Sequence, residues 1–423
     1  MKLFEELVWR GFVNQTTHPE IGEIIDKSPL TLYCGFDPTA DSFHVGQLVP
    51  LMALRHFQRA GHACIALIGG ATGMIGDPSG KKEERQLLSK DQIERNLEGQ
   101  RRQIERFLNF PEGIGPKLVN NADWLCHYKL IDFLRDIGKH FSVNALIARE
   151  SVRRRLEDRE HGISYTEFSY NLLQAYDFLY LYENYGCTLQ VGGSDQWGNI
   201  VAGIDLIRRI HDADAYGLTF PLLTKSDGSK FGKSESGNIW LDARYTSPYK
   251  FYQFFINQAD ADMPRLLRLL TELPKEEISV LEESVRETPE QRAAQRRLAF
   301  ELTSLVHGKT EALEAERASQ AMFGGDLAGL SEKVLEEVFS EVPSASFPKA
   351  YLDGQRLLAD LLVEARVFSS KGEFRRMVQS GGLYINNVRL QNTDIRVTPE
   401  WLCHEKLMVI RVGKKQYYLL RFE

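Results

Sequence analysis

The chain has few cysteines and no long apolar run. Its five cysteines form no close pair and no Cys/His cluster with zinc spacing, which argues against a disulfide framework and a structural zinc site. No stretch approaches the roughly 18 to 20 apolar residues that a membrane helix needs, and residues 1–20 lack a charged and then apolar leader. We therefore expect a cytoplasmic protein with reduced thiols and no membrane contact.

Two common nucleotide-binding fingerprints are also missing. No Gly-x-Gly-x-x-Gly follows a predicted strand, which disfavours a dinucleotide-binding fold. The glycine-rich residues 71–82 have one residue too few between Gly76 and Gly80 for a Walker loop, and Lys82 stands where Ser or Thr should follow the lysine. We reject both of these nucleotide sites.

Positive charge is scarce in most of the chain but not at its end. The net charge of the 423 residues is −6. Residues 353–423 carry 12 Lys and Arg against 8 Asp and Glu, a net of +4, which leaves −10 on the other 352 residues. This asymmetry indicates an RNA-facing tail on an acidic body, and the length predicts two or three domains.

An apolar strand followed by a loop and a helix start stands near the beginning of the chain. Residues 29–34 form an apolar, turn-bounded run, Gly35 and Pro38 break it, and helical spacing begins at Val45. In an open parallel sheet such a junction lies at the carboxyl end of a strand, where ligands bind. The backbone N–H groups of the helix start favour an anion there, so we expect a phosphate site.

The residues up to about 247 alternate between strand and helix patterns. Residues 63–70 are a second buried strand, which completes a βαβ unit with the helix that ends at residues 60–61. Further strands are predicted at 117–120, 188–191 and 217–223, and helices at 83–108, 131–148, 164–185 and 199–210. This pattern predicts an α/β fold with a parallel sheet.

Helices replace strands after residue 248. Residues 251–270, 275–286 and 289–307 are helical by period, and the Pro/Ser stretch 341–349 is typical of a linker. Helices are predicted again at 357–365 and 370–380, followed by a hairpin at Asn386 and Asn387. We therefore expect four parts: a catalytic domain at 1–247, an all-helical domain at 248–325, a linker at 326–350 and a small α+β module at 351–423.

Two separated motifs together resemble those of one enzyme family. Residues 44–47, HVGQ, are similar to the HIGH tetrapeptide of class I aminoacyl-tRNA synthetases, and residues 230–234, KFGKS, are similar to their KMSKS loop. The flanking residues 33–39, YCGFDPT, and 192–198, GGSDQWG, resemble bacterial-type tyrosyl-tRNA synthetases in particular. The likeness covers essentially the whole chain. It implies a Rossmann-like doubly wound parallel sheet and a KMSKS-like loop at 228–236.

The resemblance also implies the reaction and the partners. It implies a ligase of protein biosynthesis that joins L-tyrosine to ATP as tyrosyl-adenylate, releases pyrophosphate, and transfers tyrosine to the 3′ end of tRNA(Tyr). ATP would enter as a substrate with Mg2+, with no tightly bound cofactor and no metal site in the protein. The family implies a homodimer with the tRNA lying across both subunits. Its helical domain, which binds the anticodon arm, and its terminal module would read the anticodon arm and the long variable arm. An apolar face at 131–148 would suit a subunit interface, although a core face is the alternative.

Activation of an amino acid requires no nucleophilic side chain. The substrate carboxylate attacks the α-phosphorus of ATP, so the protein must align two anions and neutralise the charge that moves onto pyrophosphate. A glycine at Gly46 lets the purine lie on the backbone, and His44 and Thr39 can donate to phosphate oxygens. Gln47 stands where the family has the second histidine of its motif, so it can donate but cannot be cationic. A structural histidine is the alternative interpretation of His44.

Cations on two glycine-rich loops suit the leaving group. By resemblance, Lys230 and Lys233 stabilise pyrophosphate from a loop that its glycines allow to move, together with Lys81 and Arg85. An ordinary surface lysine pair is the alternative. In the terminal module the expected phosphate contacts are Arg375, Arg376, Lys414 and Lys415, against the alternative of a merely solvated basic face.

The resemblance assigns the remaining nucleotide contacts. Asp195 takes the ribose hydroxyls, and the alternative for it is a helix N-cap. The other expected ATP contacts are Cys34, Gly35, Asp37 and Gly192.

Tyrosine contacts are implied at two further sets of positions. Tyr33 and Asp177 would bind the hydroxyl of the substrate phenol. Phenylalanine would leave both buried groups unpaired, which explains why it would be rejected. The known discrimination of about 10⁵ against phenylalanine is itself that of a tyrosyl-tRNA synthetase. The expected contacts to the ammonium and carboxylate groups are Asp77, Tyr170, Gln174 and Gln196, with Asn121 as a weaker candidate.

Two rival functions remain at this point. A tryptophanyl enzyme would normally lack the terminal module and would not need a phenol acceptor at Asp177. An RNA-binding protein that keeps the scaffold without catalysis is favoured by Gln47 and the basic tail. Tyrosine-dependent exchange between ATP and pyrophosphate separates all three.

Overall fold

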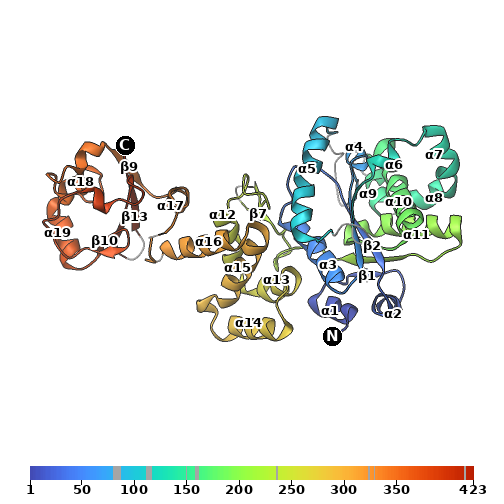
Figure 1. Ribbon diagram of the computed structural model, residues 1–423, viewed down its shortest axis with the longest axis horizontal. Helices are drawn as coiled ribbons and strands as arrows, with labels where there is room; N and C mark the ends of the chain where they lie inside the picture. Colours follow the sequence, from blue (N-terminus) through green and yellow to red (C-terminus); the bar gives the residue numbers. More distant parts are fainter. Residues whose placement is uncertain are drawn as a thin grey trace. The chain divides into compact units, whose positions relative to one another are not determined.

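The computed structural model describes residues 1–79, 87–110, 117–148, 150–157, 162–234, 237–322, 324–327, 329–413 and 416–423 (Figure 1). The chain folds into two compact units. The first comprises Met1–Thr246 and Gln258–Leu298, and the second comprises Ser247–Asn257 and Ala299–Glu423.

A six-stranded sheet forms the centre of the first unit, in the order β1-β6-β5-β2-β3-β4. Its strands are β1 (Gln15–Thr16), β2 (Thr31–Phe36), β3 (Ala63–Ile68), β4 (Lys117–Asn120), β5 (Cys187–Gly193) and β6 (Tyr216–Phe220). All neighbours are parallel except β1, which pairs antiparallel with β6. The five parallel strands follow the order of a doubly wound sheet, whose topological switch point lies between β2 and β5. The predicted Rossmann-like fold is confirmed.

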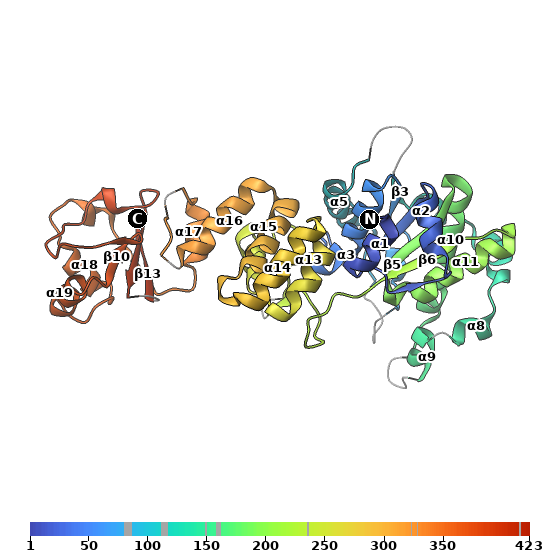
Figure 2. The same ribbon diagram turned by 90° about the horizontal axis from the view of Figure 1, so that it is seen from below.

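Helices cover both faces of this sheet. Figure 2 shows α3 and α5 on one side and α10 and α11 on the other. The described helices before and between the sheet strands are α1 (Leu3–Arg10), α2 (Ile21–Lys27), η1 (Val45–Gln47), α3 (Leu48–Arg59), α4 (Thr72–Ile75), α5 (Lys90–Phe107), α6 (Ala122–Leu125), α7 (Leu130–Asp136), η2 (Gly138–His140), α8 (Val143–Ile147), α9 (Glu150–Glu157), α10 (Tyr165–Tyr185), η3 (Ser194–Gln196) and α11 (Trp197–His211). Tyr33 on β2 packs against Phe178 on α10, with ring centroids 5.3 Å apart. The face of β2 that carries Tyr33 therefore belongs to the core beneath α10.

The later part of the first unit consists of a small hairpin and short helices. The hairpin strands are β7 (Lys233–Ser234) and β8 (Gly237–Asn238), and the helices are η4 (Asp260–Asp262), α13 (Met263–Leu270), α14 (Lys275–Glu287) and η5 (Pro289–Gln291). Arg10 on α1 donates to the carbonyls of Thr271 at 2.9 Å and Leu273 at 2.8 Å. The helical stretch expected at 248–325 is thus divided between the two units.

Several predicted boundaries are wrong. The first strand runs through Gly35 to Phe36, because all six residues of β2 pair with β3. The predicted helix 83–108 begins at Lys90 in its described part, because Ser89 forms a capping box with Gln92. The single helix expected at 131–148 is α7, η2 and α8, interrupted by Gly138 and by the extended residue Ser142.

The helix expected at 251–270 is also two helices. The first, α12 (Pro248–Ile256), ends at Asn257, and α13 begins again after the 3-10 turn η4 with a proline in its first turn. A proline at this position lacks an N–H that would be unpaired anyway, so it favours a new start rather than a continuous helix.

The second unit contains helices and a five-stranded sheet in the order β11-β10-β12-β13-β9. Its helices are α12, α15 (Ala293–His307, shared with the first unit), α16 (Lys309–Ala321), α17 (Glu332–Val338), η6 (Lys349–Leu352), α18 (Leu358–Glu364), α19 (Lys371–Gln379) and η7 (Pro399–Trp401). Its strands are β9 (Ser344–Phe347), β10 (Leu383–Ile385), β11 (Val388–Arg389), β12 (Leu407–Val412) and β13 (Gln416–Phe422).

The terminal hairpin is confirmed, and the predicted linker is folded. Asn386 and Asn387 have φ of 47° and 62°, the positive values that a two-residue hairpin turn between β10 and β11 requires. The stretch expected as a linker, 326–350, contains α17 and β9, which pairs parallel with β13. Leu335 and Phe339 lie fully buried in a core with residues of β12 and β13, so this stretch belongs to the packed module.

Across the ranges that the structure describes, no helix has the combined length and apolarity that a membrane span requires.

Candidate active site

The candidate site lies where β2 and β5 end, at the switch point of the sheet. Asp37 follows β2, and Gly192 and Gly193 are the last residues of β5. Parallel strands present their carboxyl ends at one edge, so the predicted residues of both loops meet there. The structure brings together nearly all of the described candidates on this edge.

Asp177 is a buried carboxylate held by two donors. Its side chain projects from α10 and is 2% exposed. The indole Nε1 of Trp124 donates to Oδ1 at 2.7 Å, and the amide of Asn121 donates to Oδ2 at 3.0 Å. Burial raises the pKa of Asp177 to about 7, although both hydrogen bonds oppose the rise. The carboxyl therefore changes its charge within the physiological range.

The hydroxyl of Tyr33 lies buried beside Asp177. Tyr33 is 1% exposed, and its hydroxyl has no hydrogen-bond partner among the described residues. Burial raises the pKa of Tyr33 well above its ordinary value, and the neighbouring charge of Asp177 raises it further. A buried hydroxyl without a partner is costly in a native protein, so it indicates a ligand group at this position.

A chain of hydrogen bonds links Asp177 to the end of β2. Asn121 donates to Thr72 Oγ1 at 2.9 Å, and Thr72 in turn donates to Asp37 Oδ1 at 2.9 Å. The hydroxyl of Tyr170 donates to Asp37 Oδ2 at 2.9 Å. Tyr170 is expected among the tyrosine contacts and Asp37 among the ATP contacts, and this bond joins the two side chains. The ATP candidate Asp37 is therefore shared between the two predicted subsites.

A second polar chain connects the loop after α4 with the residues that follow β5 and with α10. Gln196 donates to Asp77 Oδ2 at 2.7 Å, and Gln174 donates to Gln196 Oε1 at 3.2 Å. Asn199 donates to Gln174 Oε1 at 3.0 Å, and Ser79 donates its backbone N–H to Asp77 Oδ1 at 2.8 Å. Asp77 is 6% exposed and accepts from two neutral donors in the described residues, so no described cation bonds to this carboxyl group.

His44 is the N-cap residue of η1, the helix start that follows the loop after β2. The ring Nδ1 of His44 accepts from the backbone N–H of Gly46 at 3.0 Å. The backbone N–H of His44 donates to Gln47 Oε1 at 3.1 Å. A neutral imidazole that accepts at Nδ1 carries its proton at Nε2, so the ring can donate outward. A Cβ on Gly46 would lie 2.7 Å from His44 Cε1, which explains why glycine is needed there.

The KMSKS-like stretch that carries Lys230 and Lys233 is called the lysine loop below. This loop and the residues that follow it pack against the same helix start. The N–H of Val45 donates to Ile239 O at 3.0 Å, and the His44 and Trp240 rings are 6.3 Å apart in an edge contact. Gly232 has φ of 85°, and a Cβ on it would lie 2.4 Å from Val45 Cγ2. Lys230 is exposed in this loop. The two motifs, far apart in the sequence, therefore lie side by side.

The remaining candidates differ in how much the structure says of them. Cys34 is buried, and burial raises the pKa of its thiol to about 12, so it is a neutral neighbour of the site. Thr39 lines an open hollow with Asp37. Asp195 lies inside η3 and lines a second hollow, and the residue at the N-cap of η3 is Gly193, which disfavours capping as the role of Asp195.

Five predicted side chains cannot be placed. Lys81, Arg85, Lys414 and Lys415 lie outside the described residues, and so does the side chain of Lys233. In the second unit Arg375 and Arg376 are both exposed on α19.

Three residues of the site were missed by the sequence analysis: Thr72, Trp124 and Asn199. Trp124 follows Asn121 by three residues just after β4, so a strand end with neighbouring helical positions was a usable signal. Thr72 and Asn199 carry no such signal, because their partners come from distant parts of the chain.

Comparisons with known proteins find similar sequences along nearly the whole chain. Residues 26–324 match the family described as tRNA synthetases class I (W and Y), and residues 334–420 match the tyrosine–tRNA ligase SYY-like C-terminal domain. The chain is 51% identical to the tyrosine–tRNA ligase of Rhodopirellula baltica over 423 residues, which are 100% of this chain and 96% of that protein. It is 52% identical to that of Geobacillus stearothermophilus over 425 residues, covering 100% of both.

A solved structure shows the same likeness. The C-terminally truncated mitochondrial tyrosyl-tRNA synthetase of Aspergillus nidulans is 31% identical and superimposes with a TM-score of 0.69, covering 76% of this chain and 94% of that one.

Proposed function

The chain belongs to the tyrosine–tRNA ligases within the class I tRNA synthetases, and we propose that the edge formed by β2 and β5 is where it carries out their reaction. It activates L-tyrosine with ATP to give tyrosyl-adenylate and pyrophosphate. It then transfers the tyrosyl group to the 3′ end of tRNA(Tyr). The single observation that supports this location is the unpartnered hydroxyl of Tyr33 buried beside Asp177.

The phenol of the substrate enters between these two side chains. The substrate hydroxyl donates to the Asp177 carboxylate and accepts from the Tyr33 hydroxyl, which gives both buried groups a partner. Trp124 and Asn121 hold Asp177 in the orientation that this requires. Phenylalanine would leave both groups unpaired, and that penalty supports the choice of tyrosine.

The charged end of tyrosine lies toward the end of β5. Asp77 supplies the negative charge for the ammonium group, and Tyr170 and Gln174 add neutral hydrogen-bond partners. Gln196 bonds to Asp77 and can also donate toward the substrate carboxylate. In this position the carboxylate oxygen faces the α-phosphorus of ATP, which is held over Gly46 and Gly192 with its ribose near Asp195.

The first step is an in-line displacement at phosphorus. A tyrosine carboxylate oxygen forms a bond to the α-phosphorus, the bond to the bridging oxygen breaks, and pyrophosphate leaves with the electron pair. His44 and Thr39 donate to phosphate oxygens, and Lys230, Lys233, Lys81 and Arg85 neutralise the leaving group. Mg2+ would arrive with ATP as part of the substrate, and no resident cofactor is proposed.

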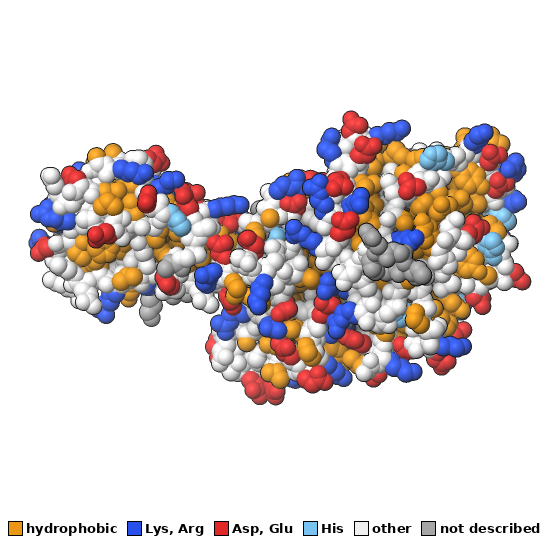
Figure 3. Space-filling model, viewed as in Figure 1, with side chains coloured by type: hydrophobic (Ala, Val, Ile, Leu, Met, Phe, Trp, Pro, Cys, Tyr) orange, Lys and Arg blue, Asp and Glu red, His pale blue; other side chains and the backbone are white. Residues whose placement is uncertain are grey.

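The second unit and one apolar face of the first unit suit macromolecular partners. We propose that residues 248–325 and 351–423 contact tRNA(Tyr), with Arg375 and Arg376 at its phosphates. Figure 3 shows hydrophobic side chains gathered over α6, α7 and α10. Leu130 and Ile131 on α7 are 70% and 72% exposed and Val143 on α8 is 59% exposed, which supports a homodimer interface on this part of the first unit. We also propose that the protein acts in the cytoplasm, where translation takes place.

Tyrosine-dependent exchange of labelled pyrophosphate into ATP tests the proposal. The intact protein should catalyse exchange with tyrosine and much more slowly with tryptophan or phenylalanine. Exchange with tryptophan alone would favour the rival tryptophanyl enzyme. Absence of exchange with retained tRNA binding would favour a scaffold that binds RNA without catalysis.

A further inference from the structure

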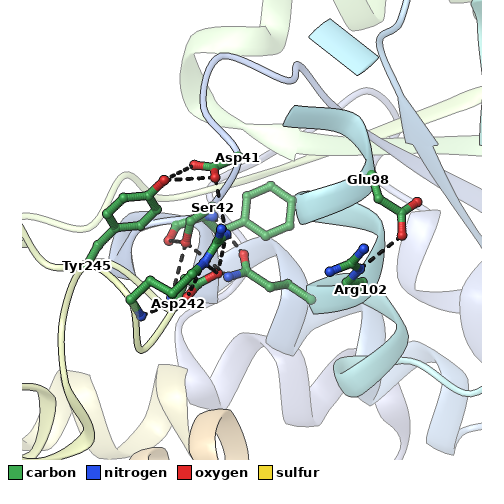
Figure 4. Close-up of polar contacts among 9 residues, drawn as sticks. Asp41, Ser42, Glu98, Arg102, Asp242 and Tyr245 are labelled. Carbon is green, nitrogen blue, oxygen red and sulfur yellow. Dashed lines mark hydrogen bonds and ion pairs between the residues drawn. The ribbon is translucent and has the colours of Figure 1, made fainter. Parts of the chain in front are cut away.

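Residues 239–245 follow the lysine loop, and they are attached at several points to residues 41–45, which lie between β2 and α3. Leu241 donates its backbone N–H to Phe43 O at 2.8 Å, and Asp242 donates its N–H to Ser42 Oγ at 3.2 Å. The hydroxyl of Tyr245 lies 2.8 Å from each carboxylate oxygen of Asp41 (Figure 4). These contacts join residues about two hundred positions apart in the sequence.

The bond between Tyr245 and Asp41 has a neutral donor, so salt screens it less than the ion pair between Arg244 and Asp41, although Tyr245 is 52% exposed. Arg244 also reaches Asp41, at 3.1 Å, but its side chain is 64% exposed, and an exposed ion pair contributes little. The Asp41 side chain is only 27% exposed, and a hydrogen bond from a hydroxyl to a carboxylate is stronger than one between neutral groups.

Helix α5 holds the other side of the same loop. Gln103 accepts from Phe43 N at 2.7 Å and donates to Ser42 Oγ at 3.0 Å. Gln100 donates to Ala40 O at 3.1 Å, and a Cβ on Gly99 would lie 2.0 Å from Asp41 O. These residues occupy one helix face, so the backbone that carries Asp41 has little freedom to move.

The other end of the lysine loop is also attached. Ser226 donates its backbone N–H to Asp262 Oδ1 at 2.7 Å, and Arg265 donates to Leu222 O at 2.8 Å. Between the two attachments, Gly228 and Gly232 have φ of 81° and 85°. The loop can therefore change its shape between fixed ends, and the position of those ends sets where its lysines arrive.

We propose that Asp41 is a positioning residue for the activation reaction, an inference that rests on the proposed function. Through Tyr245, Asp41 holds the C-terminal end of the lysine loop beside His44. This sets the position of the backbone that carries Lys230 and Lys233, the two lysines proposed to neutralise pyrophosphate. Asp41 is not one of the residues proposed to hold tyrosine or ATP, so we expect its effect to be confined to the leaving group and not to extend to tyrosine binding.

The variant Tyr245→Phe removes only the hydroxyl and keeps the ring against Trp240. We expect the rate of tyrosine activation to fall about tenfold, with the dissociation constant of tyrosine unchanged. Asp41→Asn should reproduce the effect, and the double variant should be no slower than the slower single variant. The matched control is Tyr351→Phe, which removes an exposed hydroxyl bond of 3.1 Å to Glu364 in the second unit and should leave activation unchanged.

In the reverse reaction the affinity for pyrophosphate can be measured. This affinity would not change selectively if Asp41 had only a structural role. With tyrosyl-adenylate on the protein, both variants should bind pyrophosphate more weakly while tyrosine affinity and thermal midpoint stay at their wild-type values. Wild-type activation in both variants, additive effects in the double variant, or equal losses for tyrosine and pyrophosphate would each overturn the inference. A wild-type protein without tyrosine-dependent exchange would instead refute the proposed function.

Discussion

Trp124 donates its indole N–H to Asp177 across 2.7 Å, from a short helix that begins directly after β4. The ring also stacks on Tyr180, with centroids 4.3 Å apart and planes at 15°. Stacking fixes the direction of the N–H, and the N–H fixes the carboxylate. The phenol acceptor is therefore oriented from behind, by a residue that does not touch the substrate in the proposed arrangement.

Replacing this donor should weaken tyrosine recognition. Trp124→Phe keeps an aromatic ring against Tyr180 but leaves one Asp177 oxygen without its donor. We expect the Michaelis constant for tyrosine in pyrophosphate exchange to rise about tenfold, which corresponds to roughly 1.4 kcal/mol, and that for ATP to change less than about twofold. Trp401→Phe in the terminal module is the control. A larger effect on ATP than on tyrosine would contradict the orienting role.

The raised pKa of Asp177 predicts a pH dependence. The carboxyl must be ionised to accept the substrate phenol, so tyrosine affinity should increase with pH and level off above about 7. Titration of tyrosine binding between about pH 5.5 and 8.5 measures this, with ATP binding to the same samples as the reference. Asp177→Asn should lose the step at pH 7, and a step that persists in that variant would assign it to another group.

The same pKa shift has a consequence for stability with the opposite sign. The folded state holds the Asp177 proton more tightly than the unfolded chain does, because burial penalises the charge. The free energy of unfolding should therefore decrease as pH rises from about 4 to about 7, through the contribution of this group. Denaturant unfolding of Asp177→Asn should lack that decrease. An identical pH profile in the variant would show that Asp177 does not titrate in this range.

Local chemistry in the sequence predicted the elements whose causes are local. The Asn386 and Asn387 turn, the strand 117–120 and the helix that begins after Ser164 depend on residues within a few positions of one another. The long helix expected at 131–148 failed because hydrophobic spacing continued through Gly138, where the backbone does not. The folded stretch 326–350 was missed because its burial depends on β12 and β13, some seventy residues later.

The candidate site was predictable as a place but not as a network. Strand ends and the two motifs pointed to Tyr33 and the loop at His44, and the family resemblance pointed to Asp177. The bond from Tyr170 to Asp37 was not predictable, because sequence spacing places both residues near the site without saying which carboxylate is within reach. The same holds for Thr72, which joins two strand ends that no sequence interval connects.

The close approach at Gly46 yields a steric prediction. In Gly46→Ala the new Cβ would meet the His44 ring at 2.7 Å and 2.9 Å, so the ring must rotate and its Nδ1 bond to the Gly46 N–H is lost. We expect the activation rate to fall by about two orders of magnitude. Stopped-flow measurement of adenylate formation tests this. Gly372→Ala, where the nearest atom is 3.7 Å away, is the control glycine and should be neutral.

The amide at Gln47 offers a test of charge without a change of shape. Gln47→Glu keeps the oxygen that accepts from the His44 N–H but places a negative charge beside the proposed phosphate site. The Michaelis constant for ATP should rise about tenfold, with tyrosine affinity and thermal midpoint retained. Gln92→Glu makes the same change in the capping box of α5, where Gln92 accepts from Ser89 N at 3.0 Å. Equal effects of the two variants on ATP would remove Gln47 from the nucleotide site.

The RNA contacts are best tested by charge and not by truncation. A chain cut near residue 341 would lose β12 and β13 and uncover Leu335 and Phe339, so its loss of charging would have two causes. The double variant Arg375→Gln, Arg376→Gln changes only exposed side chains on α19. Pyrophosphate exchange should be unaffected because tRNA takes no part in it. The affinity for tRNA(Tyr) should fall, and the slope of log affinity against log salt should become shallower by about 1 to 2 for the lost phosphate contacts. An unchanged slope would mean that these arginines form only a solvated basic face.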